Sequence, residues 1–359
     1  MGLTSTSTGA GAADTALVLR RERPDDRIVA LAGNPNVGKS TVFNALTGLR
    51  QHTGNWPGKT VTSAQGRCER GGRGYVLVDL PGTYSLMAHS AEEEVARDFL
   101  CFGGADGAVV VCDATCLERN LNLVLQTLEL QPRTVVCVNL LDEAERKGVR
   151  VELEALSRRL GVPVVGAAAG RGEGLEALMA AVEGVISAPE PPTPVPVRYP
   201  PPVEFAVASL RPLLEPRLRG RLPARWTALR LLEGDGAFLD RLSAALEWDP
   251  RADAALWGAV EEARAVLERQ GLGGGAWCER VVSALVETTE AIGAASVTQL
   301  RSAAGRREQR LDRLLTSRAT GIPLMLLLLA GVLWLTITGA NYPSQLLSDG
   351  LFWVQDRLS

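Results

Sequence analysis

Apolar residues in the first half of this chain come in short runs that polar or glycine-rich segments separate. The clearest runs cover residues 27–32, 75–79, 107–112 and 133–138. Runs of this length between turn residues are typical of strands that are buried on both faces of a parallel sheet. A helical segment at 41–46 follows the first run. The pattern predicts an α/β domain over 27–188, with a doubly wound, mostly parallel sheet.

The pattern changes to helical spacing beyond residue 198. Val203, Val207 and Leu210 share one helical face, and a second apolar face ends near Gly234, a residue that often terminates a helix. A proline-rich segment, 189–198, separates the two regions and is expected to be stiff and extended. We therefore predict an all-α domain over 199–318.

A third pattern begins at residue 319, where thirty consecutive residues carry no charge. A helix from Gly321 to Ala340 would be about 30 Å long, which is the thickness of a bilayer core. We predict a transmembrane helix over 319–342. In the segment 343–359, apolar residues fall on one helical face, which favours an amphipathic interfacial helix; the start of a second ordinary helix is the alternative. The residues on that face are Leu347, Leu351, Val354 and Leu358.

Charge sets the expected orientation and excludes one class of partner. Six arginines lie between 301 and 318, whereas only Arg357 follows the predicted span. Positive residues favour the cytoplasmic side, so the N-terminal domains are expected in the cytoplasm and the helix in the cell (inner) membrane. The net charge of −3 argues against a nucleic-acid partner. Residues 1–26 are rich in Gly, Ala, Thr and Ser and are predicted to form a disordered tail.

Candidate chemistry begins at the end of the first predicted strand. Residues 33–40 fit the phosphate-binding pattern G-x-x-x-x-G-K-[ST], in the strand–loop–helix context that the pattern requires. Backbone N–H groups and Lys39 are expected to hold the β- and γ-phosphates, and Ser40 is expected to bind Mg²⁺. The predicted phosphate-binding residues are Gly33, Asn34, Pro35, Asn36, Val37, Gly38, Lys39, Ser40 and Thr41.

Two further motifs predict which nucleotide binds. Asp79 ends an apolar run and can hold Mg²⁺ through water, and the Gly82 N–H can meet the γ-phosphate. Asn139 and Asp142 follow the run at 133–138. A carboxylate there can accept hydrogen bonds from the N1–H and the 2-amino group of guanine, a donor pair that adenine lacks. The ordered series predicts binding of GTP.

These motifs resemble those of the ferrous iron transport protein B (FeoB) family. The segments that carry the resemblance are 33–40, Gly-Asn-Trp-Pro-Gly-Lys-Thr-Val at 54–61, 79–86, 113–121 and 139–145. The resemblance runs from about Arg27 to the end of the chain. It implies a P-loop GTPase domain, a helical domain that transmits switch movement and a first transmembrane helix. A spacer role for the helical domain remains the alternative.

The resemblance also assigns roles in hydrolysis. Thr60 matches the switch I threonine that closes over Mg²⁺ and the γ-phosphate, and Asn36 matches a residue that holds K⁺ in potassium-stimulated members. Alternatively, Asn36 is a loop residue that occurs there because asparagine favours turns. The resemblance predicts hydrolysis that depends on Lys39, Asn36, Thr60 and Gly82, with switches at 53–62 and 79–90. Position 83 is threonine rather than the glutamine that orients water in other GTPases, so a slow intrinsic rate is expected.

The base-contacting segments depart from the common form. Leu140 stands where many GTPases carry a lysine that stacks on the base. In the loop 166–170, Ala169 keeps an N–H that could reach guanine O6, whereas Ala168 replaces a serine whose hydroxyl would brace the loop. We expect guanine selectivity with modest nucleotide affinity.

The main hypothesis is the GTP-hydrolysing cytoplasmic part of a ferrous iron transporter that couples the nucleotide state to a membrane Fe²⁺ path. The family's polytopic membrane domain does not follow within the 359 residues, so we expect either a fragment or one half of a split transporter. That domain, a small cytosolic accessory protein and a second copy of the chain are the expected partners. The alternatives are a membrane-tethered regulatory GTPase that moves no ion and a soluble RNA-associated GTPase.

Overall fold

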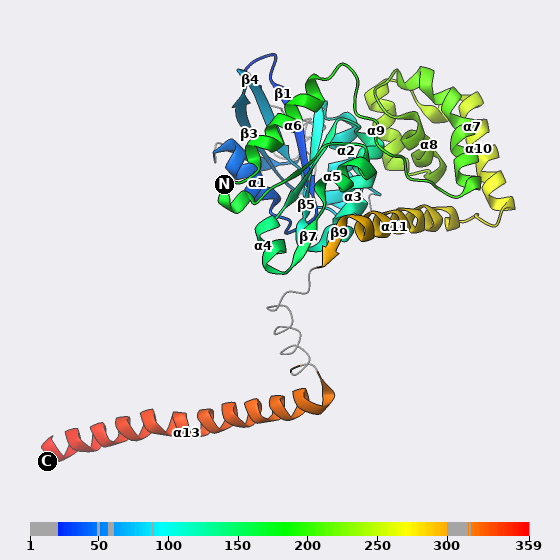
Figure 1. Ribbon diagram of the computed structural model, residues 1–359. Helices are drawn as coiled ribbons and strands as arrows, with labels where there is room; N and C mark the ends of the chain where they lie inside the picture. The colour runs from blue at the N-terminus through cyan, green and yellow to red at the C-terminus, as the bar shows by residue number, and fades with distance from the viewer. Residues whose placement is uncertain are drawn as a thin grey trace, which may run out of the picture. The chain divides into compact units, whose positions relative to one another are not determined.

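The computed structural model describes residues 21–48, 51–56, 61–87, 90–299, 315 and 317–358. The chain forms two compact units, Met1–Gln299 and Leu300–Ser359. The first unit contains a seven-stranded sheet within its described residues (Figure 1). Its order is β2 (Gln51–Asn55), β3 (Thr62–Arg70), β4 (Arg73–Asp79), β1 (Arg27–Gly33), β5 (Gly107–Asp113), β6 (Thr134–Asn139) and β8 (Val164–Gly166).

The sheet is parallel from β4 through β1, β5 and β6 to β8, and antiparallel at the β2–β3–β4 edge. The four apolar runs of the sequence form β1, β4, β5 and β6, so the predicted doubly wound α/β fold is confirmed. The parallel strands end at one edge of the sheet, and this edge brings together Gly33, Asp79 and Asn139.

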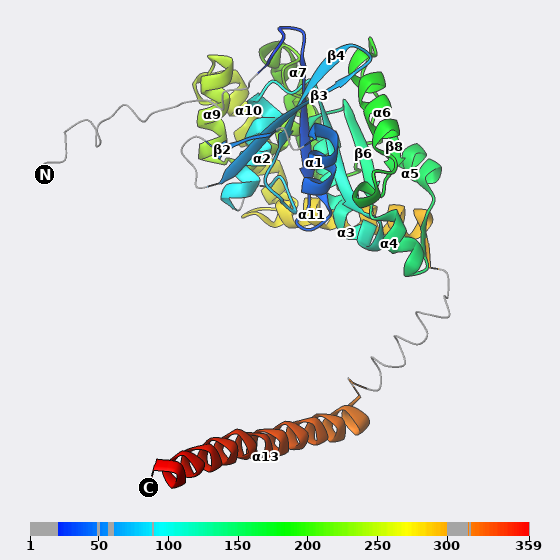
Figure 2. The ribbon, with the colours of Figure 1, turned by 90° about the vertical axis from the view of Figure 1, so that its left-hand side faces the viewer.

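Helices cover both faces of the sheet because alternate strand residues point to opposite sides. In β1, Val29 and Leu31 pack with α1 (Lys39–Thr47) and α6 (Leu175–Ser187), which Figure 2 shows in front of the sheet. Ile28 and Ala30 belong to the core on the other side, with α2 (Ala91–Phe102), α3 (Leu117–Leu130) and α5 (Leu153–Leu160).

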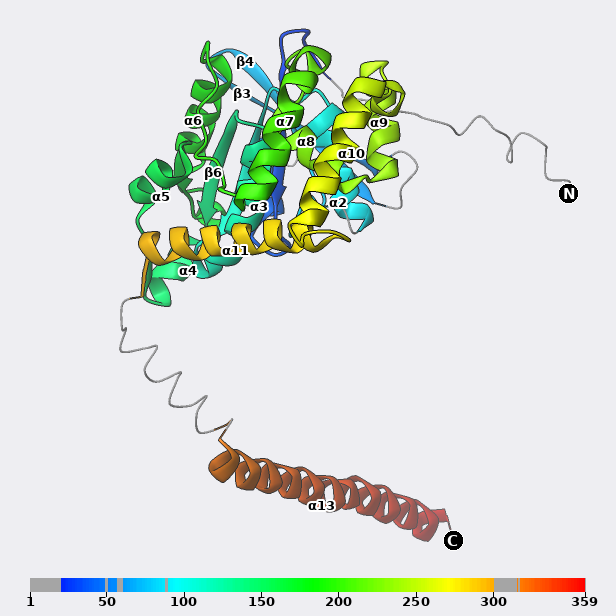
Figure 3. The same cartoon turned by 90° about the vertical axis from the view of Figure 1, so that its right-hand side faces the viewer.

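The first helix of the helical domain follows a segment at 189–200 without helix or strand, whereas the predicted linker was 189–198. Its helices are α7 (Pro201–Leu218), α8 (Ala224–Glu233), α9 (Gly236–Leu246), α10 (Ala254–Arg269) and α11 (Ala276–Ser296). The predicted apolar face of Val203, Val207 and Leu210 is buried, and Gly234 ends α8 with a φ of 78°. The helices of this domain lie against the α2–α3 face of the sheet domain (Figure 3), and its core continues into that face. There the Phe102 and Phe238 rings stack with centroids 6.1 Å apart.

One connection between the two domains had no signal in the sequence pattern. Helix α11 packs along α3, and the chain then forms β9 (Val297–Gln299). Strand β9 pairs antiparallel with β7 (Val149–Val151), which follows the predicted guanine-reading segment and the short helix α4 (Leu141–Arg146). The end of the helical domain is therefore hydrogen-bonded to the sheet domain.

The start of the described chain corrects the predicted tail, 1–26. Asp26 is buried and accepts hydrogen bonds from the Glu22 and Arg23 N–H groups, both at 3.1 Å. Arg67 of β3 donates to the same carboxylate at 3.0 Å. The pKa of Asp26 is lowered: burial raises it, but the hydrogen bonds outweigh that effect. An ion pair rather than an apolar face thus anchors the segment before β1. Residues 1–20 lie outside the described part.

The second unit contains α13 (Arg318–Leu358). Its segment Thr320–Ile337 has a mean hydropathy of 2.2 and no buried residues within the unit, and it is the one stretch among the described residues that is long and apolar enough to cross a membrane. Ile322, Leu327 and Trp334 are more than half exposed. The helix continues without a break through the predicted boundary at 342–343. The four apolar side chains predicted to face the interface, from Leu347 to Leu358, lie outside the described part.

Candidate guanine-nucleotide site

The phosphate-binding loop lies between β1 and α1, as predicted. Gly38 precedes the first helical residue with a φ of 79°, and a Cβ there would lie 2.4 Å from the Asn139 side-chain nitrogen. Glycine is therefore required at this position, both for the backbone conformation and for space. Val37 is buried, whereas Pro35, Asn36, Ser40 and Thr41 are exposed around the loop. The loop and the first turn of α1 form the type of cradle that binds phosphate groups.

Lys39 and Asp79 come together at the carboxyl edge of the sheet. The Lys39 ammonium donates a hydrogen bond to the Asp79 carboxylate, and both side chains are largely buried. Burial raises the pKa of Asp79, and the charge and hydrogen bond of Lys39 oppose that rise. These two groups are the ones expected to contact phosphate and metal, so the motifs at 33–40 and 79–82 form one site.

The start of switch II lies against the phosphate-binding loop. A Cβ on Gly82 would be 3.3 Å from backbone atoms of Pro35, and the Thr83 N–H donates to the Gly33 carbonyl at 3.2 Å. Thr83 is 2% exposed, and its hydroxyl donates to the Ser85 carbonyl at 2.7 Å. Its side chain therefore braces its own segment and does not point toward the loop of phosphate-binding residues.

Asn139, a predicted base-reading residue, braces two loops in this structure. Its side-chain amide donates to the Val37 carbonyl at 3.0 Å and accepts from the Ala169 N–H at 3.0 Å. The side chain is buried, and both ends of its amide are engaged. The Ala169 N–H, which is predicted to reach guanine O6, donates this bond to Asn139 here.

Asp142 lies in the first turn of α4, as the sequence motif requires, but it has an unpredicted partner. The Arg171 guanidinium lies 3.3 Å from an Asp142 carboxylate oxygen. Arg171 belongs to the short 3₁₀ turn Ala169–Arg171 of the base loop, and its side chain is 57% exposed. Because the pair spans two loops far apart in the sequence, no local pattern could indicate it. A guanine that binds at Asp142 would compete with the exposed Arg171 for the carboxylate.

Backbone pairing braces the base loop where a serine hydroxyl is absent. The Ala168 N–H donates to the Glu173 carbonyl at 3.1 Å, and the Glu173 N–H returns a bond to Ala168 at 3.3 Å. Leu140 has a φ of 60°, in the left-handed region that non-glycine residues rarely adopt. It caps α4 and turns the chain toward Asp142.

Switch I approaches the same edge through Trp56. The Trp56 ring packs edge-on against Phe99 of α2, with centroids 5.5 Å apart, and the backbone N–H of Trp56 donates to the Val61 carbonyl at 2.7 Å. Thr60, the predicted switch I ligand of Mg²⁺ and the γ-phosphate, lies outside the described residues.

Together, the phosphate loop after β1, the acid after β4 and the Asn-x-x-Asp segment after β6 define a P-loop GTPase domain. Comparison with known proteins extends this class to a family. Residues 27–182 match the family model described as ferrous iron transport protein B, and residues 199–291 match the model of the FeoB cytosolic helical domain. The chain belongs to the FeoB family.

Relatives and solved structures agree with this assignment. The chain is 41% identical over 211 residues to the Fe(2+) transporter FeoB of Escherichia coli K12, covering 58% of this chain and 27% of that protein. It is 48% identical over 159 residues to the Salmonella typhimurium protein of the same name, covering 43% of this chain and 21% of the relative. The chain thus spans about a quarter of the length of these relatives.

Two solved structures cover most of the first unit. The cytosolic domain of the T. maritima FeoB iron transporter in a GDP form has a TM-score of 0.61 and 31% identity, covering 76% of this chain and 99% of that one. A mutant of S. thermophilus NFeoB bound to GDP has a TM-score of 0.65 and 28% identity, covering 76% and 100%. The GDP in these relatives agrees with the nucleotide class that the site residues predict.

Proposed function

We propose that this chain is the GTP-binding and GTP-hydrolysing cytoplasmic part of a ferrous iron transporter, coupling the nucleotide state to a membrane Fe²⁺ path. One observation carries the proposal. Residues predicted to bind phosphate, metal and guanine lie at one edge of a sheet whose α2–α3 face is packed directly against a helical domain. An apolar helix long enough to span a bilayer belongs to the same chain.

The chain's own residues supply most of what hydrolysis requires. Lys39 and the N–H groups of the loop 33–40 would bind the β- and γ-phosphates, and the Gly82 N–H would contact the γ-phosphate. Asp142 would read the guanine N1–H and 2-amino groups after Arg171 moves from its carboxylate. Thr83 is buried and internally bonded, so no side chain at that position orients water, which supports a slow intrinsic rate.

Two cations are proposed for this site. Ser40, Asp79 and Thr60 are the candidates to hold Mg²⁺, since hydroxyl and carboxylate oxygens suit this ion. Asn36 is exposed in the phosphate loop with a φ of 67° and is the candidate to hold K⁺. When bound, these cations would supply positive charge against that of the phosphates.

Localisation and partners follow from the second unit. The exposed apolar side chains of Thr320–Ile337 need a lipid environment, which supports insertion in the cell (inner) membrane with the GTPase domain in the cytoplasm. The polytopic transporter domain is the proposed partner within the membrane. A small cytosolic accessory protein and self-association are further proposed partners.

The experiment measures Fe²⁺ uptake by cells that carry Lys39→Ala at the native locus of this gene. Lys39→Ala removes the phosphate-binding charge, so both GTP turnover of the purified chain and iron uptake should be lost. Lys147→Ala, an exposed position after α4, is the matched control and should change neither. Lost turnover with unchanged uptake would favour a membrane-tethered regulatory GTPase. Recovery of the protein in the supernatant after membranes are pelleted would favour a soluble GTPase.

The proposed potassium dependence has a separate test. GTP turnover should be faster in K⁺ than in Na⁺ at equal ionic strength, and Asn36→Ala should abolish that difference while leaving turnover in Na⁺ unchanged. Equal rates in the two salts would leave Asn36 as a residue selected for its loop conformation.

A further inference from the structure

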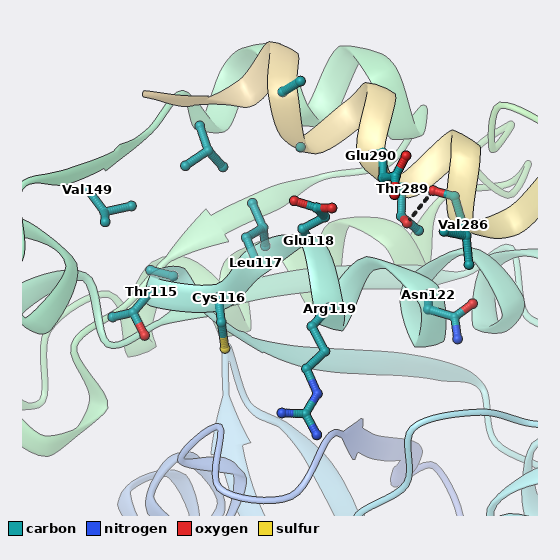
Figure 4. Close-up of a pocket in the computed structure, with 14 residues that line it drawn as sticks. Thr115, Cys116, Leu117, Glu118, Arg119, Asn122, Val149, Val286, Thr289 and Glu290 are labelled. Atoms are coloured by element: carbon teal, nitrogen blue, oxygen red, sulfur yellow. Dashed lines mark hydrogen bonds between the residues drawn. The ribbon is translucent and has the colours of Figure 1, made fainter. Parts of the chain in front are cut away.

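Helix α3 presents polar side chains to switch II on one face. Arg119, Asn122 and Gln126 are spaced three and four residues apart, so they lie on the same side of the helix. That side faces the switch II segment 84–86. Figure 4 shows Arg119 pointing away from α11, whereas Glu118 points toward it. Helix α3 therefore lies between switch II and the last helix of the helical domain.

Gln126 makes the closest contacts with the switch. Its side-chain oxygen accepts hydrogen bonds from the Leu86 N–H at 2.7 Å and from the Ser85 hydroxyl at 3.0 Å. Its side-chain nitrogen donates to Asn122 Oδ1 at 3.2 Å. Gln126 is 6% exposed and Leu86 is 2% exposed, so water cannot easily replace these bonds.

Three further contacts of α3 extend from Gln126 toward the phosphate loop. Asn122 Nδ2 donates to the Tyr84 carbonyl at 3.4 Å, and the Arg119 guanidinium lies over the Tyr84 ring, 4.5 Å from its centroid. The Arg119 carbonyl accepts a bond from Asn34 Nδ2 of the phosphate loop at 3.4 Å. The same stretch of α3 is thus bonded both to switch II and to the loop against which Gly82 packs.

We propose that Gln126 and Asn122 are positioning residues for GTP hydrolysis that hold switch II so that Gly82 lies at the phosphate loop. This inference rests on the proposed GTPase function. An amide suits the role at position 126, because its oxygen accepts from the switch while its nitrogen donates to Asn122 and thereby orients Asn122 Nδ2 toward Tyr84. Neither side chain contacts the nucleotide-binding residues that set affinity, so the two act on the catalytic step through the backbone of residues 82–86.

The test compares Gln126→Met with the parent chain, both full length in detergent micelles. Methionine keeps the length of the side chain but cannot bond the Leu86 N–H. We expect kcat for GTP to fall about ten-fold, with the Kd for GDP within about two-fold of the parent. Hydrogen–deuterium exchange of the peptide over 83–87 should become faster. Gln126 does not line the cavity of about 970 Å³ between the start of α3 and α11, so the change leaves that space intact (Figure 4).

Two variants separate positioning from general damage. Thr127→Val is the matched control, because Thr127 is also buried on α3 but, among the described residues, its hydroxyl bonds the Leu123 carbonyl of its own helix, at 2.8 Å. Its kcat should equal that of the parent. Gln126→Glu keeps oxygens that can accept from Leu86 and Ser85, so its kcat should lie closer to the parent than that of Gln126→Met. A glutamate variant as slow as the methionine variant would contradict the acceptor role.

The remaining outcomes are distinct. If the parent hydrolyses GTP and Gln126→Met does so at the parental rate, the inference is wrong and the proposed function stands. Parallel losses of kcat and GDP affinity in Gln126→Met and Thr127→Val would indicate loss of folding rather than of positioning, and would also overturn the inference. If the parent does not hydrolyse GTP, the proposed function fails. Hydrogen–deuterium exchange over 83–87 then tests the inference by itself: unchanged exchange in Gln126→Met would mean that Gln126 does not hold switch II.

Discussion

Two residues of the Asn-x-x-Asp segment have different tasks, although they stand three positions apart. Asn139 holds the phosphate loop and the base loop together through two hydrogen bonds of 3.0 Å. Asp142 lies at the start of α4 with its carboxylate toward the base loop, paired with an exposed arginine. Because an exposed pair contributes little, Arg171 should hinder guanine binding only weakly.

Asp142→Asn should therefore change base preference rather than abolish binding. The carboxylate accepts from two guanine donors, whereas an asparagine offers one acceptor and one donor and would match the 2-oxo group of xanthine. We expect GTP affinity to fall by roughly 100-fold and the affinity for xanthosine triphosphate to rise. Competition binding with the two nucleotides measures this, with Asn139→Ala as the comparison. Equal weakening toward both nucleotides in Asp142→Asn would mean that Asp142 does not read the base.

The sequence alone was sufficient to predict the site residues whose positions depend on local structure. Gly38, Lys39 and Asp79 follow from a loop pattern and from the end of an apolar strand, and the structure joins them at one edge. It was insufficient for Asn139, Arg171 and Gln126, because their partners lie 29 to 102 residues away along the chain. Side-chain hydrogen bonds of this range leave no periodic signal.

At the scale of elements, α2 and α9 are joined by an ion-pair network whose residues are likewise far apart in the sequence. Arg97 of α2 is 1% exposed, bonds Asp235 at 2.7 Å and Asp98 at 3.1 Å, and lies over the Phe238 ring. Asp235 also caps α9 by accepting from the Phe238 N–H. Likewise β9, only three residues long, is ordered by its pairing with β7 rather than by its own pattern. The helical character of the region after residue 200 was predictable, but the contacts that dock its helices were not.

Arg97→Met should strongly destabilise the fold, because it leaves Asp98 and Asp235 without their shared buried cation. We expect a loss of roughly 3–5 kcal/mol in the free energy of unfolding. Urea denaturation measures it, with Arg211→Met as the matched control: Arg211 forms an exposed pair with Glu215 on one helix, which should contribute less than about 1 kcal/mol. A similar small loss for both variants would show that the α2–α9 contact does not depend on Arg97.

A second contact between elements gives a pH prediction. Glu129 at the end of α3 accepts from the Tyr199 hydroxyl at 2.8 Å, and Arg225 lies 3.8 Å from its other oxygen. Burial raises the pKa of Glu129 above its ordinary value of 4.5, and the hydroxyl and Arg225 only partly oppose this. The native state therefore binds the proton more tightly than the unfolded chain, so this group's contribution to stability falls as pH rises above 4.5.

Glu129→Gln removes that titration while keeping an acceptor for Tyr199. The variant should gain stability relative to the parent as the pH is raised from 4.5 toward about 7. Urea midpoints at the two pH values measure the difference, and Glu154→Gln on the exposed surface of α5 is the control, for which we expect no such trend. A relative loss of stability in Glu129→Gln at the higher pH would mean that the pairing with Arg225 outweighs the cost of burial.

At the scale of the whole molecule, the continuous core makes the GTPase and helical domains a single folding unit. Apolar side chains of α2 and α3 belong to the same buried cluster as those of α7, α8 and α10. The β7–β9 pairing closes the far end of the contact. An interface of this kind resembles the inside of one domain more than a contact between domains that move independently. Nucleotide state in the sheet domain should therefore be felt throughout the unit Met1–Gln299.

Thermal unfolding tests whether the two domains unfold as a single unit. Because GDP binds only the native sheet domain, a concentration of about 100 times its Kd should stabilise the unit by about 2.7 kcal/mol, or about 5–10 °C in Tm. If the core is shared, peptides from β6 and from α8 should lose their protection from hydrogen exchange at the same temperature. GDP should raise that temperature equally for both. A helical domain that melts first, at a temperature that GDP does not change, would contradict the shared core. It would also remove the physical basis for passing switch movement through α3 and α11, because coupling between sites requires that ligand binding bias both elements.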